Sequence, residues 1–194
     1  MIIRQGRDGR RFRRASSRVI VLGAIALGAI ALAAGTANAS TGGQATGYGP
    51  TTTFAFVSPR IAGAPTGSVA MTGTGTYDVS AATLRARGLF RCTDSVGQGP
   101  LSGCMTGQGV RWSSTTFNAT QKFVCATDPP KTVTSDGHTV AFKAGFFRAG
   151  DGATPSFTAN VIVADHDIAP DVPGVQNTWI QGVGCGSALQ FFVN

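Results

Sequence analysis

Apolar and polar residues alternate with a period of two along much of the chain after residue 50. Before Arg148, for example, Val140, Phe142, Ala144 and Phe146 occupy every second position. Such alternation places successive side chains on opposite faces of a β-strand. No stretch of convincing length has the period of an amphipathic helix, so we expect an all-β protein. The predicted strands are Thr51–Val57, Ser68–Val79, Thr83–Cys92, Val110–Phe117, Gln121–Ala126, the segment ending at Arg148, Phe157–Ala164, Trp179–Val183 and Ala188–Val193.

Turn signals separate these strands every eight to twelve residues, a spacing typical of all-β folds. Ser135-Asp136-Gly137-His138 predicts a two-residue hairpin, and Gly150-Asp151-Gly152 predicts a second turn. We therefore expect eight to ten antiparallel strands in one domain, residues 40–194. That many strands either close into a barrel or pair as a sandwich, because an open sheet leaves its edges exposed. Glycines within the strands permit curvature and favour the barrel.

One segment resembles a known group of proteins. Gly73-Thr-Gly-Thr-Tyr-Asp78, followed by Leu84 to Phe90, resembles bacterial proteins with an allene-oxide-cyclase or dirigent-like β-barrel. The resemblance implies a barrel fold. None of the catalytic residues of those families can be placed in this sequence, so the resemblance implies no activity.

The first 39 residues have a different pattern. Seven arginines fall between Arg4 and Arg18, and the uncharged apolar run Val19–Ala34 precedes the triplet Ala37-Asn38-Ala39. This order is typical of a secretory signal peptide that is removed after Ala39. The apolar run has 16 residues, fewer than the roughly 20 that cross a bilayer. We therefore expect a protein without a membrane anchor after cleavage.

Removal of the leader would change the net charge of the protein. The formal net charge of the whole chain is +7, but residues 40–194 hold nine Lys or Arg, eight Asp and no Glu. The basic excess thus belongs to the leader, and a nucleic-acid partner is not expected, because such binding needs a basic surface on the folded domain. The alanine-rich leader indicates a bacterial host, and its paired arginines leave the general and twin-arginine export routes open. The expected location is extracellular, or in the periplasm or cell envelope.

Four cysteines lie in the mature part: Cys92, Cys104, Cys125 and Cys185. An even number of cysteines in an exported domain indicates two disulfides. The sequence contains no Cys-x-x-Cys pair, the spacing that would indicate a zinc site or redox chemistry. Three pairings are possible. The segment between Cys92 and Cys104 is rich in Gly, Pro and Ser, which favours a bridge closing that loop and leaves Cys125–Cys185 as the second.

The densest polar cluster is Asp165-His166-Asp167, with Asp171 four residues later. Two carboxylates two residues apart point the same way on an extended chain and could share a hard cation such as Ca²⁺. The spacing is not that of an EF-hand. The alternative is a solvated connection whose aspartates cap turns, so the main expectation is no cofactor, with calcium at Asp165 and Asp167 as the alternative.

A second candidate site is the basic row Arg85, Arg87 and Arg91, which alternates with apolar residues. If the apolar side is the core, this row faces outward and is solvated. If the row lines the mouth of a barrel, its guanidinium groups could hold a carboxylate or sulfate through paired hydrogen bonds.

Three functions are compatible with these patterns. The first is an exported, non-enzymatic domain that binds a small apolar ligand, a glycan or an extracellular protein. The second is a small barrel enzyme, a cyclase, isomerase or hydrolase, that uses the Asp165–Asp171 segment. Its catalytic residues are unknown, because the mature chain has no Gly-x-Ser-x-Gly elbow and only His138 and His166 as histidine bases. The third is a structural cell-surface component that associates through an uncovered strand edge.

Overall fold

The computed structural model describes residues 51–126 and 128–193. The predicted signal peptide, residues 1–39, lies outside the described residues. Within the described ranges the chain forms ten strands, and it supplies no helix long and apolar enough to cross a membrane. The strands are β1 (Thr52–Gly63), β2 (Ser68–Asp78), β3 (Thr83–Asp94), β4 (Arg111–Asn118), β5 (Thr120–Phe123), β6 (Lys131–Thr134), β7 (Thr139–Phe147), β8 (Phe157–Ala164), β9 (Thr178–Ile180) and β10 (Gly184–Val193).

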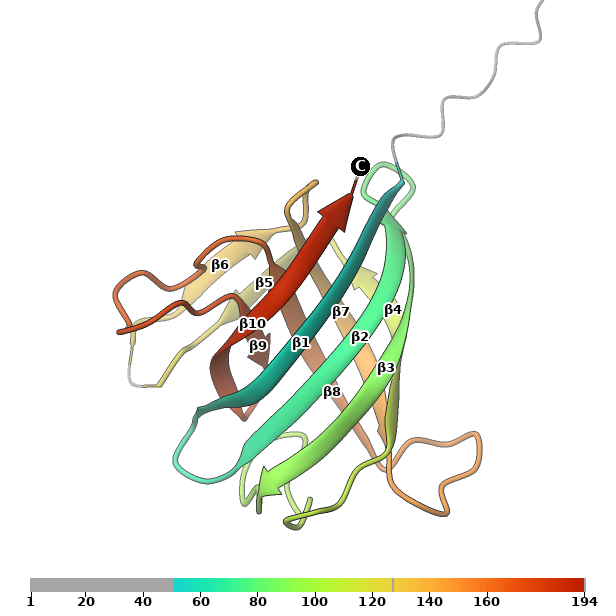
Figure 1. The fold of residues 1–194 in the computed structure, drawn as a ribbon, viewed down its shortest axis with the longest axis vertical. Helices are drawn as coiled ribbons and strands as arrows, with labels where there is room; N and C mark the ends of the chain where they lie inside the picture. Colours follow the sequence, from blue (N-terminus) through green and yellow to red (C-terminus); the bar gives the residue numbers. More distant parts are fainter. Residues whose placement is uncertain (1–50, 127, 194) are drawn as a thin grey trace, which may run out of the picture. The chain divides into compact units, whose positions relative to one another are not determined.

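Eight of these strands close into an antiparallel barrel in the order β1-β10-β9-β8-β7-β4-β3-β2 (Figure 1). The predicted all-β fold and the preference for a barrel are therefore confirmed. The strand β1 bends at a bulge between Val57 and Arg60, where Pro59 cannot donate a ladder hydrogen bond. The remaining strands, β5 and β6, pair only with each other and form a separate two-stranded sheet.

Aromatic side chains fill the barrel interior. Trp112 on β4 stacks on Phe142 of β7, with ring centroids 5.4 Å apart, and its Nε1 donates a hydrogen bond to the carbonyl of Thr72 at 2.8 Å. The indole lies against the backbone of Gly73, where an added Cβ would overlap the ring. Close packing of this kind leaves a solid core rather than a channel. Its largest fully buried side chains include Trp112, Tyr77, Phe54, Phe142, Phe146, Ile61 and Met71.

A second hydrophobic core lies outside the barrel wall, between β7–β8–β9 and the β5–β6 sheet. Trp179 contacts Phe123 edge-on at 6.1 Å, and its Nε1 donates to the carbonyl of Val124 at 3.0 Å. Because β7 and β8 face the barrel interior on one side and this sheet on the other, Ala141 and Ile162 are also fully buried.

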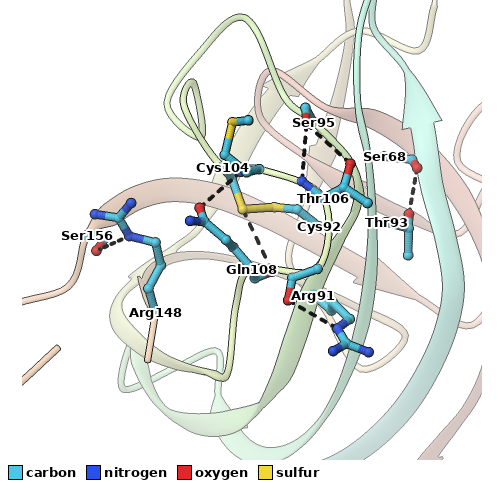
Figure 2. The surroundings of a disulfide bond; sticks show 12 residues. Ser68, Arg91, Cys92, Thr93, Ser95, Cys104, Thr106, Gln108, Arg148 and Ser156 are labelled. Atoms are coloured by element: carbon cyan, nitrogen blue, oxygen red, sulfur yellow. Dashed lines mark hydrogen bonds between the residues drawn. A yellow bond between two sulfur atoms is a disulfide. The ribbon is translucent and has the colours of Figure 1, made fainter. Parts of the chain in front are cut away.

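Both predicted disulfides are present. Cys92 pairs with Cys104, 12 residues away, and closes the loop that follows β3 (Figure 2). Cys125 pairs with Cys185, 60 residues away, and ties the end of β5 to β10. The first bridge stabilises a loop beyond the barrel strands, whereas the second fastens the outer sheet to the barrel.

The predicted hairpin at residues 135–138 is wrong. The turn exists, because the carboxylate of Asp136 accepts hydrogen bonds from the N–H groups of His138 and Thr139, both at 2.8 Å. Gly137 does not adopt the positive φ of a type I′ turn, and the flanking strands do not pair, since β6 joins β5 whereas β7 joins β4 and β8. Here the chain crosses from the outer sheet into the barrel. The second predicted turn is confirmed at Asp151, whose N–H donates to the carbonyl of Arg148.

Candidate functional site

The outward-pointing side chains of β10, β1, β2 and β3 form a continuous surface, which we call the outer face. These four strands are neighbours in the barrel and lie side by side at the front of Figure 1. Their register aligns side chains in rows across the strands, and Phe191, Ala55, Thr74 and Arg87 form the central row. The outer face consists of Leu189, Phe191 and Val193 on β10, Thr53, Ala55 and Val57 on β1, Thr72, Thr74 and Thr76 on β2, and Arg85, Arg87, Leu89 and Arg91 on β3.

Arg85 and Arg87 border a shallow depression of about 520 Å³ on this face. Both side chains are exposed, as expected for the solvated side of β3, and in the described part of the chain neither takes part in an ion pair or a hydrogen bond. Hydroxyl groups surround them. The hydroxyl-bearing residues of the depression are Thr53, Thr74, Thr76, Ser113 and Ser114.

Two of these hydroxyls have partners within the protein. Thr74 donates to the carbonyl of Phe54 at 3.1 Å, and Ser114 accepts the N–H of Ala86 at 2.9 Å. The other three hydroxyls have no such contact in the described structure. The depression therefore offers two guanidinium forks together with groups that can donate or accept hydrogen bonds.

The outer face is cationic, because it carries Arg85, Arg87 and Arg91, and neither of the two carboxylates on its four described strands forms an ion pair with Arg85 or Arg87. Asp78 is buried at the end of β2, where it accepts the N–H of Ala81 at 2.9 Å. Asp94 ends β3 and lies 3.6 Å from Arg60. Two guanidinium groups without an ion-pair partner favour an anionic ligand.

The structure separates Arg91 from the other two arginines of the predicted row. Its Nε donates to the carbonyl of Gly107, at 3.3 Å, three residues beyond the loop that Cys92–Cys104 closes. The outward direction of the whole row is as predicted, but only Arg85 and Arg87 border the depression.

On β10 and at Val57 of β1, the outer face is apolar. Leu189 and Phe191 on β10 are 78% and 72% exposed, and Val57 on β1 lies opposite Leu189. A further hollow of about 650 Å³ runs between Phe191, Val57 and Arg87. Contiguous exposed apolar surface of this kind marks binding or assembly sites.

The predicted acidic cluster is divided among separate partners. Asp165 lies 2.6 Å from Nδ1 of His138 and 3.1 Å from Nδ1 of His166, whereas Asp167 accepts the N–H of Ala169 at 2.9 Å. Asp171 pairs with Lys131 of β6 at 3.1 Å. Across residues 51–126 and 128–193, no three His, Cys, Asp or Glu side chains are placed to hold a metal ion. The geometry therefore gives no support to the calcium alternative at Asp165 and Asp167.

Asp165 and His138 alter each other's titration. The hydrogen bond to Asp165 raises the pKa of His138 above its ordinary value of 6.5. Partial burial acts to raise the pKa of Asp165, but hydrogen bonds from His138 and His166 outweigh it and hold that pKa below its usual value. Both histidines are largely exposed, so the three side chains form a hydrogen-bonded cluster at the surface.

Sequence reasoning missed Ser113, Ser114 and the threonines as members of the arginine site. Alternation shows which residues of one strand share a face, but strand order decides which strands lie beside them. The apolar part of the outer face could have been recognised in the sequence, because residues 188–193 are apolar at nearly every position. That pattern indicates apolar surface on both sides of the strand, and only one side is covered.

Comparisons with protein-family models, curated proteins and solved structures found no match for this chain. The resemblance to allene-oxide-cyclase and dirigent-like barrels therefore remains a prediction.

Proposed function

We propose that this protein is an exported binding module that holds an acidic glycan, carrying carboxylate or sulfate groups, against its outer face. The observation that carries the proposal is the unpaired Arg85–Arg87 pair within a depression lined by hydroxyl groups. Export is part of the proposal and is supported by the leader pattern of residues 1–39 and by the two disulfides.

The two arginines suit a chain of repeated anionic groups. They are two positions apart on β3, so their Cα atoms lie about 7 Å apart along the strand. Each guanidinium can donate two parallel hydrogen bonds to one carboxylate or sulfate. Sugar hydroxyls would bond to the hydroxyls of Thr53, Thr76 and Ser113, and the apolar side chains nearby would cover the C–H faces of the sugar rings.

The filled interior favours binding over catalysis. A barrel enzyme with its substrate inside needs an enclosed cavity, but Trp112, Phe142 and Phe146 occupy that space. The Asp165–Asp171 segment, which the enzyme alternative would use, is engaged with two histidines, a backbone turn and Lys131.

Binding to polysaccharides tests the proposal directly. Isothermal titration would compare a polyuronate, a sulfated polysaccharide and a neutral glucan as ligands of the wild-type protein. We expect binding to one or both acidic polymers, no binding to the neutral one, and an affinity that falls as salt is added. The Arg85→Gln/Arg87→Gln variant should bind at least about tenfold more weakly, because two charge-assisted contacts are lost.

The matched control is Lys122→Gln/Lys143→Gln, which removes the same charge from exposed positions on β5 and β7. It should bind like the wild type. Equal losses of affinity in the two double variants would show that binding depends on net charge alone and not on Arg85 and Arg87. Failure of both acidic polymers to bind the wild-type protein would overturn the proposal.

A further inference from the structure

The last third of β10 is an open sheet edge. This strand pairs with β1 along most of its length but with β9 only at Gly184, Cys185 and Gly186. In the described part of the chain, no strand pairs with residues 187–193 of β10 on the side away from β1. The barrel is thus closed by a three-residue contact, and the strand continues beyond that contact.

Asn177 shows which backbone groups face this edge. Its side chain accepts the N–H of Ala188 at 2.7 Å and donates to the carbonyl of the same residue at 3.1 Å. Alternate residues of a strand direct their N–H and C=O groups to the same side. The backbone groups of Gln190 and Phe192 therefore also point away from β1, and no backbone partner lies there within the described structure.

The edge lacks the features that usually protect such strands. Natural edges carry charged side chains, proline or bulges that prevent pairing with another chain. β10 has ten residues and includes no charged residue and no proline. Its side chains on the outer face, Leu189, Phe191 and Val193, are apolar and exposed.

We propose that this edge pairs with β10 of a second copy of the same chain. In an antiparallel arrangement centred on Phe191, Gln190 of each copy faces Phe192 of the other. Both residues direct their N–H and C=O groups outward, so the two pairs would form four backbone hydrogen bonds. Leu189 of each copy would then lie beside Val193 of the other, and the two Phe191 rings would meet at the two-fold axis.

A second copy fits this edge because the arrangement is self-complementary. A two-fold contact brings the same surface of both subunits together, and an uncharged apolar strand meets its own copy without electrostatic repulsion. Arg85 and Arg87 lie three strands away on β3, so they remain clear of the contact. The apolar strip of one outer face would continue directly into that of the other.

Pairing would also bring two arginine sites onto one sheet. Seven strand spacings of about 4.8 Å separate the two β3 strands, which gives at most roughly 34 Å. A long acidic glycan could then bind both sites, with the gain in affinity that bivalency provides. Only this consequence rests on the proposed function, since the dimer itself needs no glycan.

Sedimentation equilibrium of residues 40–194 over a range of concentrations, without glycan, tests the proposal. We expect a reversible monomer–dimer equilibrium. Phe191→Lys should shift it towards monomer at least tenfold, because it places two like charges at the two-fold axis. Leu89→Lys is the matched control, since Leu89 is 62% exposed on the same face but lies on β3, and it should dimerise like the wild type.

A second variant tests the backbone contacts. Gln190→Pro removes an N–H that points away from β1 and should also weaken the dimer. A wild-type protein that stays monomeric at several hundred micromolar would overturn the proposal. A dimer that persists in Gln190→Pro but is lost in Phe191→Lys would contradict edge pairing and indicate that the two copies stack through their outer faces. Because glycan titration is separate, failure of the dimer and failure of the proposed function are distinguishable.

Discussion

Loss of the Cys125–Cys185 bridge should destabilise the outer sheet before the barrel. Replacing both cysteines with alanine releases a cross-link between residues 60 positions apart, whereas the Cys92–Cys104 bridge spans only 12. From loop-closure entropy, the long bridge stabilises the fold by about 4 kcal/mol and the short one by about 3 kcal/mol. The long bridge should therefore contribute about 1 kcal/mol more.

The two tryptophans report separately on the two cores. Trp112 lies inside the barrel, and Trp179 lies beneath the β5–β6 sheet against Phe123. Without the long bridge, the contacts that hold this sheet to the barrel are non-covalent and include packing, the Trp179–Val124 hydrogen bond and the Asp171–Lys131 ion pair. We therefore expect the surroundings of Trp179 to become solvated at lower denaturant concentration than those of Trp112.

The assay is urea unfolding followed by fluorescence, with Trp112→Phe and Trp179→Phe used to isolate each indole. In Cys125→Ala/Cys185→Ala the Trp179 transition should precede the Trp112 transition. In Cys92→Ala/Cys104→Ala the two should coincide, because that bridge does not fasten the β5–β6 sheet to the barrel. Coincident transitions in the first variant, or a smaller stability loss than in the second, would refute the reasoning.

Two further predictions concern the barrel interior and the histidine cluster. Gly73→Ala places a methyl group within the Trp112 ring. Chemical denaturation should show a free energy of unfolding about 1–3 kcal/mol lower than that of the wild type. An unchanged free energy of unfolding would contradict the close contact between Gly73 and Trp112. In Asp165→Asn the pKa of His138 should fall towards 6.5, as measured by an NMR pH titration. In the wild type, the raised pKa of His138 stabilises the fold below about pH 6.5, and this contribution is lost as the pH rises through the folded-state pKa. A His138 pKa that does not change in the variant would exclude Asp165 as the cause.

The strands and their buried faces were predictable from the sequence. The alternation in β3 correctly places Ala86 and Phe90 inside and Arg85 and Arg87 outside. The disulfides were also predictable, because the segment between Cys92 and Cys104 is rich in Gly, Pro and Ser and indicates a loop to be closed. In each case the deciding information is local, within one strand or one loop.

The outer sheet and the open edge were not predictable, because both depend on partners distant in the chain. The Asp136-Gly137 turn indicates a reversal, but the choice of β5 rather than β7 as the partner of β6 is made by packing against Trp179 and Ile162. Similarly, nothing within Ala188–Val193 shows that β9 begins only at Thr178, opposite Gly186, which leaves the edge of β10 beyond Gly186 uncovered.

The separation of core and outer face has a consequence for how this protein can change over generations. Arg85, Arg87 and Thr76 are exposed on the outer face, so substitutions there alter recognition with little loss of stability. Destabilisation usually limits the number of mutations that a binding surface can accumulate. In this barrel, destabilisation mainly limits substitutions at the inward-facing positions. Ligand preference can therefore diverge rapidly between related chains while the fold stays the same.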